Sequence, residues 1–302
     1  MNHTNVDPKE LFKRTASILR PEISRRETWA VIGVGSGGAR VAEEAARFGI
    51  GTILLVDRPD ERLEQHNVIR HVLGFPDLGR LKTEALADHL LNIHPDTRVE
   101  AISLDVVADR DQLTEIVGRA TQVHLCTDNE PSKHVVNEVA VKAGSPLVFA
   151  GVFDGGCGGE VGRVSAGGAC YACMAAYLNR SSAPDDRQAH AETFDYSNPA
   201  GNERSTAALN LDIAQIALIQ ARVGLMTMLG RLDRSADLSG NYVLFGNRTV
   251  EGLFPRPLSS EIWQIPRDPH CLVCGATDMT ETELDDAYER IIADAMCKEP
   301  RC

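Results

Sequence analysis

Residues 29–48 read WAVIGVGSGGARVAEEAARF, and this stretch decides the fold. The apolar run 29–34 stops at glycines, which is typical of a buried parallel strand, and residues 38–48 have the apolar spacing of a helix. A glycine-rich turn at this junction lets the backbone approach a phosphate, and the helix start offers unpaired N–H groups. We therefore predict a nucleotide site built on Gly33, Gly35, Gly37 and Gly38.

Strand and helix patterns alternate through the first half of the chain. Further strands are predicted at 52–57, 98–104, 122–127 and 146–150, and further helices at 79–92, 109–119 and 131–143. This alternation predicts an α/β fold with a doubly wound, mostly parallel, Rossmann-like sheet. Asp57 ends the second strand, 19 residues after Gly38, where a carboxylate can bond ribose hydroxyls. The pattern does not choose between NAD and ATP.

The pattern changes near residue 155, where glycines become frequent. Strand patterns at 161–165, 242–245 and 261–265 predict an antiparallel C-terminal extension, and a long apolar helix is expected at 206–229. The polar residues 179–205 predict a long crossover loop. We divide the chain into a helical lead-in (1–28), a main domain (29–278) and an acidic helical tail (279–302).

Composition limits the classes of partner. The 302 residues carry 31 Lys+Arg and 43 Asp+Glu, a net charge of −12, which argues against nucleic acid or an anionic membrane surface as a general partner. The N-terminus shows no signal-peptide pattern, and charged or amide side chains interrupt the apolar stretch 211–229. We expect a cytoplasmic protein, in which cysteines stay reduced.

Two CxxC pairs predict a metal site. Cys170 and Cys173 form one pair, Cys271 and Cys274 form the other, and 97 residues lie between the pairs. Four thiolates fit tetrahedral Zn²⁺ and leave no open position, so the site would be structural. The alternative is two unrelated pairs of buried thiols. A redox CxxC is disfavoured because neither pair is predicted to open a helix after a strand.

Three further segments carry the chemistry: EQHNVIRH (64–71), GRLK (79–82) and CTDN (126–129). Together with the glycine turn and both CxxC pairs, they resemble the ThiF/MoeB family, which includes the ubiquitin-activating enzymes, over residues 10–275. The resemblance implies that ATP adenylates the C-terminal carboxylate of a ubiquitin-like or sulfur-carrier protein. It also implies a β-grasp substrate ending in Gly-Gly, an E2-like or sulfurtransferase acceptor, Mg²⁺ and a homodimer.

The resemblance also assigns residues. The transition state gains negative charge, so fixed cations lower the barrier. Phosphate binding falls to Arg70 and Lys82 with Asn67 beside them, Mg²⁺ binding to Asp128 with Asn129 next to it, and ribose binding to Asp57. An arginine from the lead-in would enter the partner subunit's site, and Arg14 is our candidate over Arg20, Arg25 and Arg26. Taken singly, Arg70 and Lys82 can also be ordinary surface residues, and Asp128 a helix cap.

Two departures from the family pattern matter. No cysteine lies between Cys173 and Cys271, where ubiquitin-activating enzymes carry their thioester cysteine. Either the reaction stops at the acyl-adenylate, or another thiol accepts the acyl group, such as Cys157 or a tail cysteine (Cys297, Cys302). We favour an incidental turn cysteine at 157, and a core thiol at Cys126. The segment 57–67 is about two residues longer than usual, which leaves its second acid, Asp60 or Glu61, ambiguous.

Three alternatives remain at this point. An NAD-dependent oxidoreductase needs an acid/base pair that we cannot place. A non-catalytic scaffold subunit is disfavoured by the retained Arg70, Lys82 and Asp128. A relative that cyclises a modified tRNA base is disfavoured by the net charge of −12.

Overall fold

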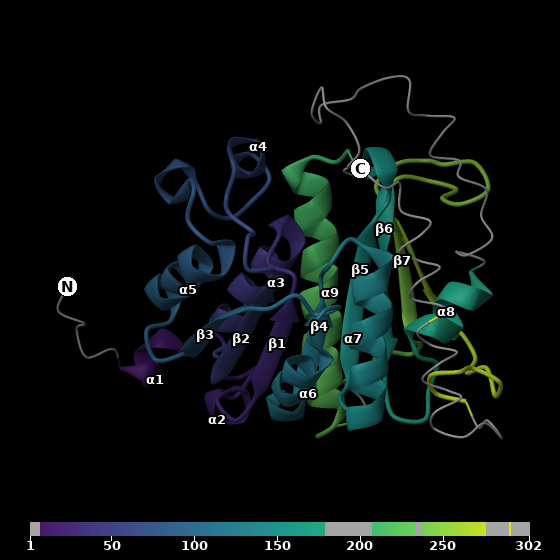
Figure 1. Ribbon diagram of the computed structural model, residues 1–302, viewed down its shortest axis with the longest axis horizontal. Helices are drawn as coiled ribbons and strands as arrows, with labels where there is room; N and C mark the ends of the chain where they lie inside the picture. Colours follow the sequence, from purple (N-terminus) through teal and green to yellow (C-terminus); the bar gives the residue numbers. More distant parts are fainter. Residues whose placement is uncertain (1–6, 179–206, 234–236, 276–289, 291–302) are drawn as a thin grey trace.

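The computed structural model describes residues 7–178, 207–233, 237–275 and 290. One eight-stranded sheet organises the chain, in the order β3-β2-β1-β4-β5-β6-β7-β8 (Figure 1). The strands are β1 (Thr28–Ile32), β2 (Thr52–Asp57), β3 (Arg98–Ser103), β4 (Gln122–Leu125), β5 (Leu147–Val152), β6 (Gly158–Val164), β7 (Tyr242–Gly246) and β8 (Ser259–Trp263). The pairs among β1 to β5 are parallel, and β6 to β8 add on antiparallel, so the predicted fold class is confirmed.

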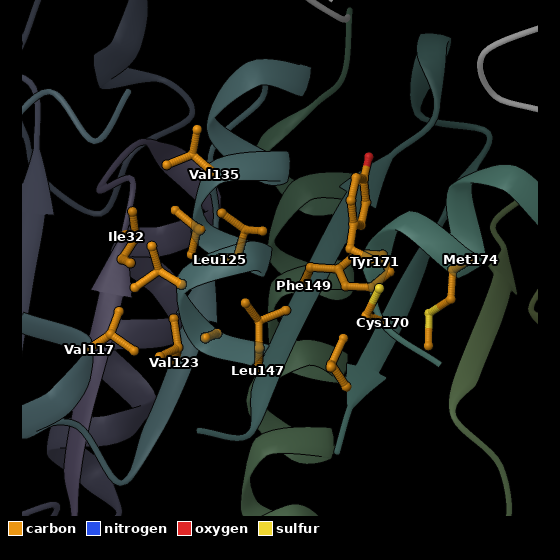
Figure 2. Close-up of a cluster of buried hydrophobic side chains, with 14 of the residues drawn as sticks. Ile32, Val117, Val123, Leu125, Val135, Leu147, Phe149, Cys170, Tyr171 and Met174 are labelled. Carbon is orange, nitrogen blue, oxygen red and sulfur yellow. The ribbon is translucent and has the colours of Figure 1, made fainter. Parts of the chain in front are cut away.

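Helices cover both faces of the sheet. They are α1 (Pro8–Leu11), α2 (Pro21–Ser24), α3 (Ser36–Arg47), α4 (Gln65–Val68), α5 (Lys82–Ile93), α6 (Arg110–Arg119), α7 (Glu130–Ala143), α8 (Tyr171–Tyr177) and α9 (Asn210–Gly230), with short 3₁₀ turns η1 (Phe75–Asp77) and η2 (Asp154–Gly156). Successive residues of β1 face opposite sides, so Trp29 and Val31 pack under α3, α5 and α9, whereas Ala30 and Ile32 pack under α6 and α7. Figure 2 shows the core on the face covered by α6 and α7, where Val123, Leu125 and Leu147 meet Val117 and Val135.

Helix α9 is long and apolar because it lies on the central strands. Its 21 residues have the length and composition of a membrane span, and half of the qualifying window is buried inside the fold. It contacts α3, β5 and β6, and Gln220 donates from it to the carbonyls of Leu125 and Val148. These contacts are those of the buried core helix that the sequence predicted.

Several details differ from the sequence prediction. Helices α4 and α8 were not predicted, because each is short and lies in a polar or glycine-rich context. The antiparallel strand expected at 161–165 begins earlier, at Gly158. The crossover loop (179–205) lies outside the described residues. So does the tail (279–302), apart from Arg290, and with it Cys297 and Cys302.

Candidate nucleotide site and metal centre

The glycine turn lies at the carboxyl end of β1, where an open parallel sheet binds ligands. Two of its glycines are required by packing. Gly33 has φ +87°, and a Cβ there would lie 2.8 Å from the Cys126 carbonyl carbon; a Cβ on Gly38 would lie 1.9 Å from the Gly33 carbonyl oxygen. A Cβ on Gly35 would meet nothing within 4 Å, and one on Gly37 would meet only Ile213 at 3.9 Å. The turn is therefore open along Gly35 and Gly37.

The first turn of α3 presents hydrogen-bond donors to this open side. Gly35 is the N-cap and has no capping side chain. The first intrahelical bond is donated by Ala39 to Gly35, and within the described residues no acceptor is recorded for the N–H groups of Ser36 and Gly37. Unpaired N–H groups and the positive end of a 12-residue helix favour an anion. The donor set fits a phosphate group.

The side chain of Asp57, at the end of β2, fixes the Val34 N–H inside the turn. Asp57 accepts from the Val34 N–H at 2.9 Å and, with its other oxygen, from the Arg58 N–H at 2.9 Å. Burial raises the pKa of Asp57, although these two backbone hydrogen bonds oppose the shift. Asp57 thus lies at the predicted place beside the turn, and also supports it.

The two predicted phosphate-binding cations differ in their present contacts. Lys82 begins α5, is 12% exposed, and donates to the Glu61 carboxylate at 2.5 Å. Arg70 is half-buried, and within the described residues no carboxylate lies within ion-pair distance of it. Asp60 is 75% exposed and pairs only with Arg58 among the described residues. Of the two ambiguous acids, Glu61 is therefore the one that faces the site.

Two predicted amide ligands cap helices. The Asn67 side chain accepts from the Glu64 N–H at 3.0 Å in the capping box of α4. Asn129 is the N-cap of α7 and accepts from the Ser132 N–H at 2.9 Å. Because Asn129 supplies the cap, the alternative role of Asp128 as that cap is wrong. Asp128 is exposed, and no ion pair to it is recorded among the described residues.

Arg14 lies away from this edge within one chain. Its segment is anchored by Phe12, whose ring contacts the position of Gly49 and the ring of His94. Gly49 follows the last turn of α3, so this anchor lies a helix length, about 18 Å, from the glycine turn. In Figure 1, α1 and α2 lie at the end of the sheet opposite α4. The structure does not bring Arg14 together with Arg70, Lys82 and Asp128.

The two cysteines near the sheet edge are poor nucleophiles. Cys157 follows η2 and is half-buried; burial raises its pKa, and the neighbouring Arg248 only partly offsets this. Burial raises the pKa of Cys126 to about 12, and its thiol donates to Gln220 at 3.5 Å. Cys126 follows β4 directly and is partly buried against the core, rather than inside a strand as predicted.

The four CxxC cysteines meet at one point on the other side of the fold. Their sulfur atoms all lie within 4.8 Å of one another, with Sγ–Sγ distances of 3.9 Å (Cys170–Cys173), 3.6 Å (Cys170–Cys271) and 3.4 Å (Cys173–Cys274). Four ligands at 2.3 Å from a tetrahedral ion stand about 3.8 Å apart. The cluster therefore fits one tetrahedral metal ion, and the alternative of two unrelated pairs is wrong.

Local backbone prepares both halves of this cluster. Cys170 is the N-cap of α8, so the first pair does open a helix, contrary to the sequence prediction. The Cys170 thiol donates to the Cys173 sulfur at 3.9 Å, and this shared proton lowers the pKa of Cys173 and raises that of Cys170. Gly275 donates to the Cys271 carbonyl at 2.7 Å, and a Cβ there would lie 2.5 Å from the Pro269 carbonyl oxygen. Gly275 therefore closes a tight knuckle after the second pair.

Sequence reasoning missed one residue of the nucleotide edge. His71 contacts the Val34 carbonyl, 37 residues away along the chain. Its position next to Arg70, at the end of the segment EQHNVIRH (64–71), was the signal.

Comparison with known proteins agrees with this geometry. Residues 21–261 match the model of the ThiF family. The SAMP-activating enzyme E1 of Haloferax volcanii is 30% identical over 145 residues, 48% of this chain and 52% of that protein. The sulfur carrier protein adenylyltransferase of Thermus thermophilus is 27% identical over 276 residues, 88% of each chain. Among solved structures, Escherichia coli MccB has a TM-score of 0.66 at 19% identity, covering 92% of this chain and 75% of that one.

For the curated relatives that head this comparison, the match spans about half of their length or less. The family match itself covers most of the present chain, from α2 to β8. It contains the glycine turn, both cations and the first CxxC pair. The chain therefore belongs to the ThiF family.

Proposed function

We propose that the protein uses ATP to adenylate the C-terminal carboxylate of a small ubiquitin-like or sulfur-carrier protein. One observation carries this proposal: an open glycine turn, two cations and an exposed carboxylate lie on neighbouring loops at the carboxyl edge of one parallel sheet. The names of the relatives support it, since the Thermus protein is a sulfur carrier protein adenylyltransferase and the Haloferax protein is an activating enzyme.

In the proposed reaction, a carboxylate oxygen of the substrate attacks the α-phosphorus of ATP, and pyrophosphate leaves. The N–H groups at the start of α3 and the side chains of Arg70 and Lys82 hold phosphate oxygens and offset their growing charge. Asp57 takes the ribose hydroxyls. Asp128, which is exposed and free of ion pairs among the described residues, would hold Mg²⁺, which shields the leaving pyrophosphate.

We further propose that the reaction on this chain ends at the acyl-adenylate. The raised pKa of Cys157 keeps its thiol protonated, and a thiol is a weak nucleophile compared with a thiolate. An external acceptor, such as a sulfurtransferase, would then take the acyl group. Mass spectrometry after mixing enzyme, ATP and a Gly-Gly substrate tests this. An adduct that is sensitive to dithiothreitol, on Cys157 or on the tail cysteines Cys297 and Cys302, would contradict it.

The proposed functional unit is a homodimer in which Arg14 enters the partner subunit's site. Helix α9 supports this because it leaves Leu211 (71% exposed) and Leu218 (44%) on its outer face, beside a groove against α3 lined by Phe48 and Ile219. Sedimentation of the wild type and of Leu218→Glu tests the dimer. A wild type that is monomeric at assay concentration would contradict it.

The central experiment is ATP–pyrophosphate exchange in the presence of a Gly-Gly substrate protein. Asp128→Ala and Arg70→Ala should each lower exchange by about a hundredfold or more, because each removes a charge that acts on the reacting phosphates. Asp96→Ala and Arg98→Ala are matched controls, since both residues lie at the amino end of β3, and should retain exchange. Full exchange in the first pair would overturn the assignment of the site.

A further inference from the structure

Resting on the proposed function, we propose that His71 is a positioning residue of the nucleotide site, which holds the glycine turn in its phosphate-binding conformation through the peptide of Val34. The proposal starts from a contact that the reaction described above does not use. His71 Nε2 lies 2.9 Å from the Val34 carbonyl oxygen, and the Leu73 N–H donates to His71 Nδ1 at 3.1 Å.

These two contacts define the state of the ring. Because Nδ1 accepts a hydrogen bond, it carries no proton, and the proton of the neutral imidazole lies on Nε2. Nε2–H therefore donates to Val34. His71 is 7% exposed, so water does not replace either contact easily.

Two side chains bind the two backbone polar groups of Val34. Asp57 takes the N–H at 2.9 Å and His71 takes the C=O at 2.9 Å. Val34 itself is fully buried, and its neighbour Gly33 donates to Val56 at 2.8 Å. The backbone just before the open positions Gly35 and Gly37 is thus fixed before any nucleotide arrives, which reduces the ordering cost of binding.

The electrostatic surroundings keep His71 neutral. Burial is the main cause that lowers the pKa of His71 to about 4, and Lys82 and His89 on α5 and Arg40 on α3 add to it. Protonation would remove the acceptor at Nδ1 and place a charge among these cations. The ring is therefore neutral at neutral pH, where Nε2–H donates to Val34 and Nδ1 accepts from Leu73.

The arrangement predicts which substitution can replace the histidine. A glutamine side chain has both an N–H donor for the Val34 carbonyl and an oxygen acceptor for the Leu73 N–H. A leucine fills similar space and offers neither. His71→Gln should therefore keep nucleotide affinity, and His71→Leu should lose it.

The test measures ATP binding to the full chain by calorimetry, together with the KM for ATP and kcat of exchange. His71→Leu should weaken ATP binding and raise the KM for ATP about tenfold, with kcat within about twofold of wild type. His71→Gln should keep both the ATP affinity and the KM for ATP at the wild-type level. His66→Ala, an exposed histidine of α4, is the matched control and should bind ATP as the wild type does.

Each outcome has a distinct meaning. Wild-type affinity in His71→Leu, or equal losses in the Gln and Leu variants, would overturn the positioning role. A wild type that binds no ATP would instead overturn the proposed function. Circular dichroism and the Tm of the variants separate loss of folding from loss of positioning.

Discussion

The nucleotide edge and the cysteine cluster are built in opposite ways. The four thiols converge on one point within 4.8 Å and fit a tetrahedral ion as they stand. At the nucleotide edge, most polar side chains are instead engaged with the protein: Lys82 with Glu61, Asn67 and Asn129 with helix N-termini, and Asp57 with Val34. A ligand that stays bound allows a dedicated cage, whereas a ligand that comes and goes requires groups that are satisfied without it.

The largest expected effect concerns the cage. Replacing one ligand in Cys271→Ser leaves three buried thiols around an incomplete site, so we expect zinc to be lost and the Tm to fall by more than about 10 °C. Zinc content by elemental analysis and thermal unfolding check this. Cys157→Ser is the matched control and should change the Tm by less than about 2 °C. A chelator should lower the Tm of the wild type. If the wild type contains no metal and Cys271→Ser has the same Tm as the wild type, the cysteine cluster is not a metal cage and does not differ from the nucleotide edge in this way.

A smaller effect separates the glycines of the turn by role. Gly38→Ala places a Cβ 1.9 Å from the Gly33 carbonyl oxygen and should destabilise the fold by about 2 kcal/mol or more. Gly37→Ala meets open space at the start of a helix, so stability should stay level or rise by up to about 1 kcal/mol, while ATP affinity falls. Urea unfolding and calorimetry measure the two quantities. Unchanged ATP binding in Gly37→Ala would show that phosphate does not approach this turn.

The smallest expected effect concerns Lys82, which must leave the Glu61 carboxylate to bind a phosphate of ATP. In Glu61→Gln the ammonium group loses its carboxylate, and because such partly exposed pairs contribute little, ATP affinity should rise by only about threefold. Asp60→Asn, on the same segment but 75% exposed, is the control and should bind ATP unchanged. Weaker binding in Glu61→Gln would mean that Glu61 holds the nucleotide rather than competing with it.

The sequence was sufficient to predict the position of an element or site residue where the local pattern and the topology agree. The βαβ order, the glycine turn, Asp57 at a strand end and the cysteine spacing each constrain position through the backbone, and the structure matches them. It was insufficient where a side chain chooses between near partners. Nothing local shows that Asn129 rather than Asp128 caps α7, that Glu61 rather than Asp60 reaches Lys82, or that His71 bonds Val34. These choices depend on distances set by the packed fold.

The placement of α8 and α9 bears on how such a protein can diversify. Helix α8 is joined to the cysteine cluster through Cys170 and Cys173, and the residue three places before α9, Ala207, donates to Asp154 beside the sheet edge at 3.2 Å. The four cysteines of the cluster and the residues of the glycine turn all lie before residue 178 or after residue 207. Helices α8 and α9 are thus held at separate places in the described fold, so selection can act on the metal cluster and on the sheet edge independently.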